Sequence, residues 1–438
     1  MKNIRPYYFD FFAASLFLFL PAAMITGPFI PDLIVSILAI YFFFIIRNNA
    51  ALYKNYFFIC FIFFYLLILV STFFSHNFLI SIQTTLPYLR FGLFVLTGFY
   101  LICKFPKIKI YFLNFLVFCF FILSVDGFCE FFIGRNILGY AYTNGRLAGL
   151  FGDELILGSY VSRSLPIAMA IFFSMYAKIK FKFFYYSIFL FSALLIIMSG
   201  ERTAFAILTI FLISILCFCN FKLILKFFTF FFFLLSFALI LFFSSSLKSR
   251  FIDETFSEIK GSNDSIILHK NIDGNNNSKY SILSEELLAM RDKSKNNKLF
   301  LLSTAHESAW RISLKMFQSS KLIGIGPKMF RYECDNDLYK VYERGCSTHP
   351  HNIYAQILAE VGIFGFLFFF ILFLTASFLC FFNAFFLKKR IINNYQIILI
   401  CSYIAILFPL LPSGNFFNNW LSVTMYLPLT FLVSSFYE

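Results

Sequence analysis

The residue best suited to acid–base chemistry in this sequence is His351, in the string Thr348-His349-Pro350-His351-Asn352 just before a long apolar stretch. Imidazole is the side chain whose unperturbed pKa lies closest to neutral pH. At the point where a membrane helix meets water, His351 could take a proton from a hydroxyl group that attacks a lipid-linked substrate. The alternative is an interfacial histidine that only makes a hydrogen bond near the start of a helix. His349 is expected to support this site or to be solvated.

Three arginines are candidate binding residues for an anionic substrate: Arg146, Arg202 and Arg311. A guanidinium group stays protonated and makes bidentate contacts with phosphate oxygens. We expect Arg202 at the outer end of an apolar stretch and Arg311 on an amphipathic helix, where both could reach a phosphate at headgroup level. The structural alternatives are a pair of Arg202 with Glu201, a pair of Arg146 with Asp153 or Glu154, and an ordinary charged helix face for Arg311.

Glu360 is a carboxylate inside an apolar stretch, where an unpaired charge is costly. Nine residues separate it from His351, or about 13 Å along a helix, on the opposite face. We therefore expect no contact between these two side chains. Glu360 is expected to support the site structurally, paired with Arg163, while Gly362 and Gly365 allow close helix packing.

Composition identifies the class of protein. With 60% hydrophobic residues and 13% charged residues, the chain is far more apolar than soluble globular proteins, whose apolar share is about 45–50% and charged share about 25%. Apolar stretches long enough to cross about 30 Å of hydrocarbon recur along it. The sequence therefore predicts an all-α, polytopic membrane protein with about twelve transmembrane helices. We expect these at residues 11–30, 33–46, 56–74, 86–103, 110–128, 155–176, 183–198, 203–220, 226–245, 352–382, 393–411 and 418–435.

The distribution of lysine and arginine predicts the orientation of these helices. Fifteen of these residues fall in the termini and short connections on one side, whereas the short connections on the other side hold Arg90, Arg135, Arg146 and Arg202. Because short cytoplasmic loops are enriched in basic residues, we expect both termini in the cytoplasm. The net charge of +14 thus reflects topology and attraction to anionic lipids, and it gives no reason to expect nucleic acid as a partner.

The predicted helices divide the chain into three parts. Residues 1–245 hold nine helices, residues 246–350 form one large extracytoplasmic loop, and residues 351–438 hold three helices. Within the loop, the Asn-rich stretch 260–298 is poor in apolar residues, and we expect it to be flexible.

The residue pattern in the second part of the loop predicts an amphipathic helix at residues 303–320. We expect this helix to lie on or near the membrane surface. Thr304 and Glu307 have the spacing of a capping box. A breaker cluster at 324–327 ends the segment. The apolar positions recur at helical spacing in Trp310, Leu314 and Phe317.

Two cysteines and a short acidic turn of the large loop could form a disulfide or a metal site. Cys334 and Cys346 share the loop, and either a disulfide or two unpaired thiols is possible in an oxidising compartment. The short acidic turn Asp335-Asn336-Asp337 is more typical of a polar loop than of a metal site. We predict no metal ion and no cofactor.

Several segments resemble the O-antigen ligase and polymerase family. The string His351-Asn352-Ile353-Tyr354 leading to Glu360 and Gly365 is similar to the family signature. Further similar segments follow the family order from about residue 146 to 420. Glu201 departs from the family pattern, in which a small or polar residue is usual. The similar segments are Arg146–Gly152 with Leu157–Tyr160, Ser199–Thr203, Trp310–Arg311 and Gly324–Pro327 with Phe330.

The resemblance implies an enzyme of the bacterial inner membrane and cell envelope, with its active site on the periplasmic side. Its donor would be a glycan on undecaprenyl diphosphate, and its acceptor either lipid A core oligosaccharide, as in lipopolysaccharide biosynthesis, or another glycan. It further implies an inverting, metal-independent transfer in which His351 is the general base and Arg202, Arg311, Arg146 and Asn352 bind substrate.

Two other functions stay open at this point. A polymerase of the same family would differ from a ligase only in its acceptor. A polysaccharide flippase would also have about twelve helices, but it should carry polar residues near the membrane midplane, whereas those of interest here gather at one face and in one loop.

Overall fold

The computed structural model describes residues 4–48, 52–143, 145–260, 304–341, 346–387 and 390–437. Within these ranges all regular elements are helices and the only strand-like pairs are two isolated bridges in the connection before α6. The helices of the first part are α1 Ile4–Ala23, α2 Phe29–Ile45, α3 Tyr56–Phe73, α4 Phe78–Lys104, α5 Ile108–Ile133, α6 Leu157–Ser174, α7 Lys182–Met198, α8 Arg202–Phe218 and α9 Leu223–Phe243. The short helices α10 Ser245–Lys248 and α11 Glu254–Lys260 follow, then α14 Thr304–Ser319, α15 Phe330–Glu333, α16 Ile353–Phe385, α17 Asn394–Ile406 and α18 Asn419–Ser434.

The helical bundle confirms a polytopic membrane protein. Six described helices, namely α1, α3, α4, α5, α9 and α16, are long and apolar enough to cross a membrane. Each of the twelve predicted ranges overlaps one helix of the bundle, while the number of crossings stays a prediction. In α9 only Phe233 is buried, so this phenylalanine-rich helix presents nearly all its side chains outward.

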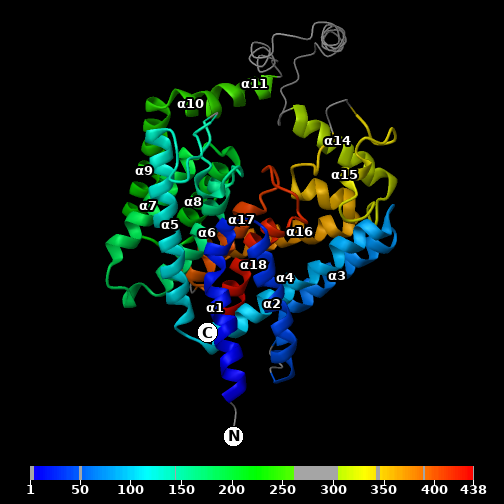
Figure 1. The fold of residues 1–438 in the computed structure, drawn as a ribbon, viewed down its shortest axis with the longest axis horizontal. Coiled ribbons are helices and arrows are strands. Elements are labelled where there is room, and N and C mark those ends of the chain that lie inside the picture. Colours follow the sequence, from blue (N-terminus) through cyan, green and yellow to red (C-terminus); the bar gives the residue numbers. More distant parts are fainter. Residues whose placement is uncertain are drawn as a thin grey trace.

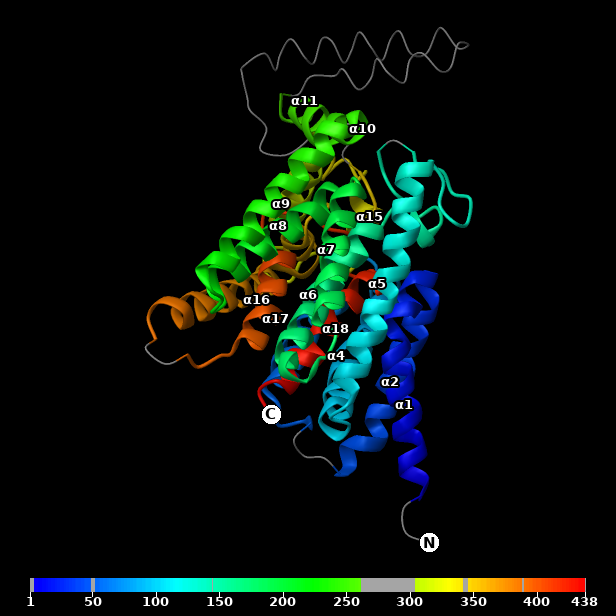
Figure 2. The same cartoon turned by 90° about the vertical axis from the view of Figure 1, so that its left-hand side faces the viewer.

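The bundle has two distinct ends (Figures 1 and 2). Both chain termini lie toward one end, and α10, α11 and α14 lie toward the other. In the centre, α4 packs against α2 and α18, and α17 packs against α6 and α8. Which end faces the cytoplasm stays a prediction.

The long helix α16 is broken at Gly362, whose backbone has φ 79° and ψ −167°. A turn of the large loop, residues 321–327, fills this break. A Cβ atom on Gly362 would lie 2.4 Å from the carbonyl oxygen of Leu322, and one on Gly324 would lie 2.4 Å from the carbonyl carbon of Glu360. We expected Gly362 to admit a neighbouring helix, but what approaches it is this turn.

Backbone hydrogen bonds join the turn to the broken helix. The N–H groups of Ile325 and Gly326 donate to the carbonyl oxygens of Ala359 and Glu360, each over 3.0 Å. These carbonyls lack their helical partners at the break, and a buried backbone group in a membrane protein needs a partner from within the protein. The turn is therefore an integral part of α16.

Helix α14 packs on the start of α16, and a second small core of buried residues lies between them. The buried face of α14 consists of Ala309, Ile312 and Met316, which contact Ala359. Leu314 of the predicted apolar face is 45% exposed, and the contact of that face with the membrane surface stays a prediction. The Asn-rich stretch predicted at 260–298 lies, except for its first residue, outside the described residues.

Candidate functional site

Three histidines gather at the start of α16. The ring centroid of His351 lies 4.2 Å from that of His349 and 5.3 Å from that of His306. His306 belongs to α14, so its position depends on the packing of the loop onto α16. It is half-buried. We call these three residues the histidine cluster.

The connection between α17 and α18 forms hydrogen bonds with two residues of the histidine cluster. The carbonyl oxygen of His351 accepts a hydrogen bond from the N–H of Ser413 over 2.8 Å, and Nε2 of His349 lies 3.2 Å from the carbonyl oxygen of Ser413. His351 has φ 54°, a left-handed backbone conformation that is uncommon outside glycine. The surrounding bonds fix this conformation.

Asn352 is buried and all its side-chain bonds go to the backbone. Its Oδ1 accepts from the N–H of Ala355 over 3.0 Å and so caps α16. Its Nδ2 donates to the carbonyl oxygens of Pro409 and Leu411. With both ends of its amide bonded to the backbone, Asn352 fixes the start of α16 next to His351, and the substrate binding predicted for it stays a prediction.

Burial keeps two of these imidazoles neutral at neutral pH. Burial, and next the neighbouring His351, lower the pKa of His349 to about 4. Burial, together with His306, also lowers the pKa of His351. A neutral imidazole is the form that accepts a proton, so both surroundings favour the base form.

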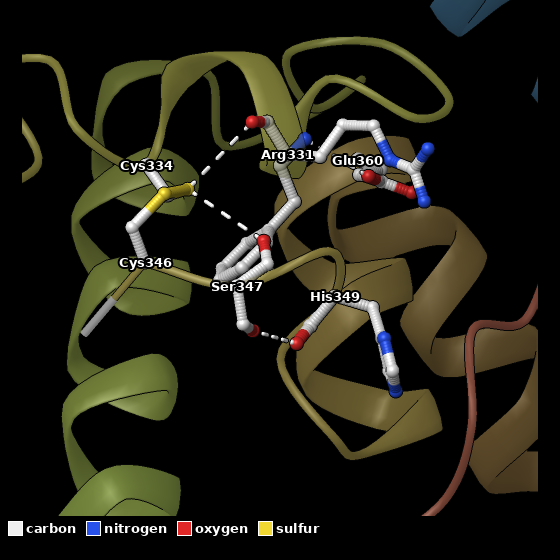
Figure 3. Close-up of a disulfide and its surroundings, with 7 residues drawn as sticks. Arg331, Cys334, Cys346, Ser347, His349 and Glu360 are labelled. Carbon is white, nitrogen blue, oxygen red and sulfur yellow. Dashed lines mark hydrogen bonds between the residues drawn. A yellow bond between two sulfur atoms is a disulfide. The ribbon is translucent and has the colours of Figure 1, made fainter. Parts of the chain in front are cut away.

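Arg331 adds a positive charge to the histidine cluster, and sequence reasoning missed it. It lies on α15, beside Glu360 and near His349 (Figure 3). Among the described residues, its buried Nε atom has no hydrogen-bond partner. The only signal in the sequence was its position just after the breaker cluster 324–327.

Glu360 connects the loop to α16 and is 1% exposed. Its Oε1 accepts from the N–H of Phe330 and its Oε2 from Nε2 of Gln356, each over 3.0 Å. The expected pair with Arg163 was wrong, because Arg163 instead donates to the carbonyl oxygen of Ser159 over 3.2 Å. The supporting role predicted for Glu360 thus takes the form of a bond that holds α15 in place.

A disulfide joins Cys334 to Cys346, with Cα atoms 5.0 Å apart (Figure 3). It links the end of α15 to the segment that leads to the histidine cluster. In that segment the Ser347 hydroxyl donates to the carbonyl oxygen of His349 over 2.6 Å. The disulfide therefore restrains the backbone that carries His349 and His351.

Three arginines form a second group near the start of α8, which we call the arginine cluster: Arg146, Arg202 and Arg250. Nε of Arg250 donates to the carbonyl oxygen of Gly200 over 2.6 Å, and Nη1 of Arg202 donates to the hydroxyl of Thr255 over 3.2 Å. Burial, and next the charge of Arg146, lower the pKa of Arg250. Guanidinium groups that lie together can bind an anion, and Glu254 beside them pairs with Arg250 at 3.6 Å. Sequence reasoning missed Arg250, whose position depends on the turn after α9.

The predicted partners of these arginines differ from those in the structure. Arg146 donates to the carbonyl oxygen of Leu155 over 2.5 Å, and its buried Nε has no partner among the described residues. Glu201 accepts from the N–H groups of Gly158 and Ser159 and thereby caps α6. Its carboxylate fixes the start of one helix next to the arginine cluster.

Arg311 lies on the exposed side of α14. Its Nε donates to Oε1 of Glu307 over 2.8 Å, one helical turn away. Such a pair is common on solvated helices. This bond agrees with the structural alternative considered above.

A small cavity lies between the helices that carry the two clusters. Its lining includes Arg163 of α6, Ile353 at the start of α16, and Ser413, which holds His349. Nε of Arg163 and Oγ of Ser413 are both buried without a hydrogen-bond partner among the described residues. The cavity volume of about 10 Å³ is close to the lower limit for one water molecule.

The predicted site residues therefore fall into two groups. His349 and His351 meet with His306 and Arg331, while Arg146 and Arg202 meet with Arg250. Arg250 lies in the turn between α10 and α11, and His306 and Arg331 lie on α14 and α15. These elements lie toward the same end of the bundle (Figure 1).

One comparison with known proteins bears on these groups. Residues 187–370 match the model of a protein family described as O-antigen ligase, and this confirms the resemblance found in the sequence. The matched range contains the whole histidine cluster, Arg202, Arg250 and Arg331. No curated protein matches the chain.

Proposed function

Because residues 187–370 carry the domain of the O-antigen ligase family, we propose that this membrane enzyme transfers a glycan from undecaprenyl diphosphate to lipid A core oligosaccharide or a comparable glycan acceptor. The reaction takes place at the end of the bundle that carries α10, α11 and α14. The observation that carries this proposal is the histidine cluster, which presents a neutral His351 at the start of an apolar helix.

His351 acts as the general base in this proposal. It takes the proton of the acceptor hydroxyl while that oxygen forms a bond to the anomeric carbon of the donor. The bond between the anomeric carbon and the diphosphate oxygen breaks, and undecaprenyl diphosphate leaves with the electron pair. A direct displacement of this kind inverts the anomeric centre. A positioned general base contributes a factor of roughly 10² to 10⁴ in rate.

The arginine cluster binds the diphosphate of the donor. Its three guanidinium groups match the negative charge that grows on the leaving group. The unpartnered Nε of Arg146 supports this role, because a buried donor without an acceptor is costly unless a ligand supplies one. Arg331 and Arg311 lie on the histidine side and bind anionic groups of the donor or acceptor there.

The disulfide supports a periplasmic location for this end of the protein. Disulfides persist in oxidising compartments such as the bacterial periplasm and are rare in the cytosol. The disulfide of Cys334 and Cys346 next to the histidine cluster thus supports the proposal that the site faces the periplasm and that both termini face the cytoplasm.

The test is glycan transfer by the purified protein in lipid vesicles with a defined undecaprenyl-diphosphate-linked glycan. Lipid A core oligosaccharide and a second lipid-linked glycan are supplied as acceptors in separate reactions. We expect product with the first acceptor, and none with His351→Ala. Product with the second acceptor alone would identify a polymerase. Movement of the donor across the vesicle membrane without any transfer would identify a flippase and overturn the proposal.

A further inference from the structure

We propose that His306 is a positioning residue of the transfer reaction, which keeps His351 in its base form by placing a second imidazole against it from the loop helix α14. This inference rests on the proposed function, in which His351 takes the proton of the acceptor hydroxyl. It adds a residue that lies 45 positions earlier in the sequence and outside the segments that resembled the family.

The position of His306 is fixed by packing. It lies in the first turn of α14, and Ala309, Ile312 and Met316 of the same helix are buried against Ala359 of α16. Its ring stands nearly perpendicular to that of His351, at 80°, with 5.3 Å between the centroids. A side chain on a packed helix holds this separation better than one on a free loop.

Two imidazoles at this separation compete for protons. A proton on one ring disfavours a proton on the other by direct repulsion. At 5.3 Å, a positive charge on His306 lowers the pKa of His351, and it does so more strongly in a half-buried site than in bulk water. His306 therefore lets His351 stay neutral at a lower pH than it would alone.

The other titratable and charged groups around His351 do not cancel the effect of His306 on its protonation. His349 is neutral near pH 7, because burial and His351 lower its pKa to about 4. From α15, Arg331 adds a positive charge that also lowers the pKa of His349. In α14, Glu307 is engaged by Arg311.

Two further parts of the chain, α16 and the connection 407–418, lie next to the histidine cluster. Glu360 of α16 is bound to the N–H of Phe330. The connection 407–418, which holds the backbone of His351, contains no titratable side chain. His306 is thus the titratable partner of His351 that comes from another element of the fold.

The test measures transfer rate against pH for the full-length protein in vesicles, with two substitutions of opposite electrostatic effect. His306→Gln removes the charge, so the pKa of His351 rises and the acid limb of the profile moves up. His306→Lys provides a permanent charge, so the acid limb moves down. His76→Gln is the matched control, because His76 faces Glu333 and Tyr339 outside the cluster.

The outcomes separate this inference from the proposed function. Opposite shifts of the two His306 variants, with the His76 variant unchanged, support the inference. If both variants lower the rate equally at every pH, or leave the acid limb in place, His306 has only a structural role and the inference fails while the proposed function stands. If His351→Ala still transfers glycan, the proposed function fails first.

Discussion

The backbone N–H of Phe330 donates to the carboxylate of Glu360 over 3.0 Å, and this bond joins the large loop to a membrane helix beside the histidine cluster. Through it, α15 and its Arg331 are held against the first part of α16. Gln356 donates to the second oxygen of the same carboxylate. A carboxylate is the only side-chain group of this size that offers an acceptor to both donors.

Glu360→Gln should therefore destabilise the protein and reduce transfer. The glutamine amide would point its NH₂ group at either the N–H of Phe330 or Nε2 of Gln356. The buried donor that loses its acceptor would lower the free energy of unfolding by about 1–3 kcal/mol. Thermal unfolding in detergent measures the loss. Glu333→Gln is the control, because the contacts of Glu333 are partly exposed: a pair with His76 at 3.6 Å and a hydrogen bond from Nδ2 of Asn336 over 3.0 Å. Equal melting temperatures for the two variants would contradict the bracing role of Glu360.

The wild-type reaction should keep its rate at mildly acidic pH. The pKa of His351 is lowered in the folded protein by burial and by His306, and the base must be neutral to act. Activity should therefore rise with pH through a midpoint below the ordinary histidine value of about 6.5, and stay high above it. A pH–rate profile with saturating donor measures this midpoint. A midpoint above 6.5 would exclude His351 in its described surroundings as the titrating base.

Arg202→Lys and Arg250→Lys should each weaken donor binding about tenfold. Lysine keeps the charge but loses the planar fork that binds two phosphate oxygens. The apparent affinity for the lipid-linked donor, obtained from initial rates, measures this. Arg135→Lys serves as the control, since Arg135 is exposed in the connection after α5. If all three variants keep the wild-type donor affinity, the arginine cluster does not bind the diphosphate.

Loss of the disulfide should reduce both stability and transfer. Cys334 and Cys346 close a loop with a separation of 12 residues, for which chain entropy predicts a contribution of about 3 kcal/mol. The Cys334→Ser/Cys346→Ser double variant also frees the backbone before His349. Cys60→Ser, at an exposed free cysteine, provides the comparison. A reductant should lower the stability and the transfer rate of the wild-type protein, as the double substitution does. It should have no effect on the double variant.

Gly362→Ala should be far more destabilising than Gly139→Ala. Both glycines have positive φ, 79° and 90°, so both substitutions incur the backbone strain of about 1–3 kcal/mol that an L-residue meets there. Only at Gly362 would the added Cβ lie 2.4 Å from a backbone atom, whereas nothing lies within 4 Å at Gly139. Comparison of the two unfolding temperatures isolates the contact with the loop turn.

The positions of the helices were predictable because length and composition set them. An apolar stretch of sufficient length forms a helix in a membrane whatever its neighbours are, and every predicted range overlaps one. The break at Gly362 was not predictable, because the apolar stretch continues through it without a change in composition. The buried face of α14 was also missed, since Trp310, Leu314 and Phe317 have helical spacing but α16 packs against the adjacent face.

The candidate site was predictable only where chemistry is visible in one short string. His351 and His349 lie next to each other, and Arg202 adjoins a helix start, so local reasoning finds them. His306, Arg250 and Arg331 acquire their surroundings from contacts between distant segments. A charged residue in a polar loop gives no local sign of burial, so the sequence alone could not assign these three to the site.

The turn that fills the break in α16 has one more consequence. Because Ile325 and Gly326 complete the hydrogen bonding of that helix, we expect α14, α15 and the first part of α16 to unfold in one cooperative step. A nick between α11 and α14 would leave this turn and α16 on one fragment, still bonded to each other, and the two fragments would co-purify because α17 packs on α6 and α8 and α18 packs on α4.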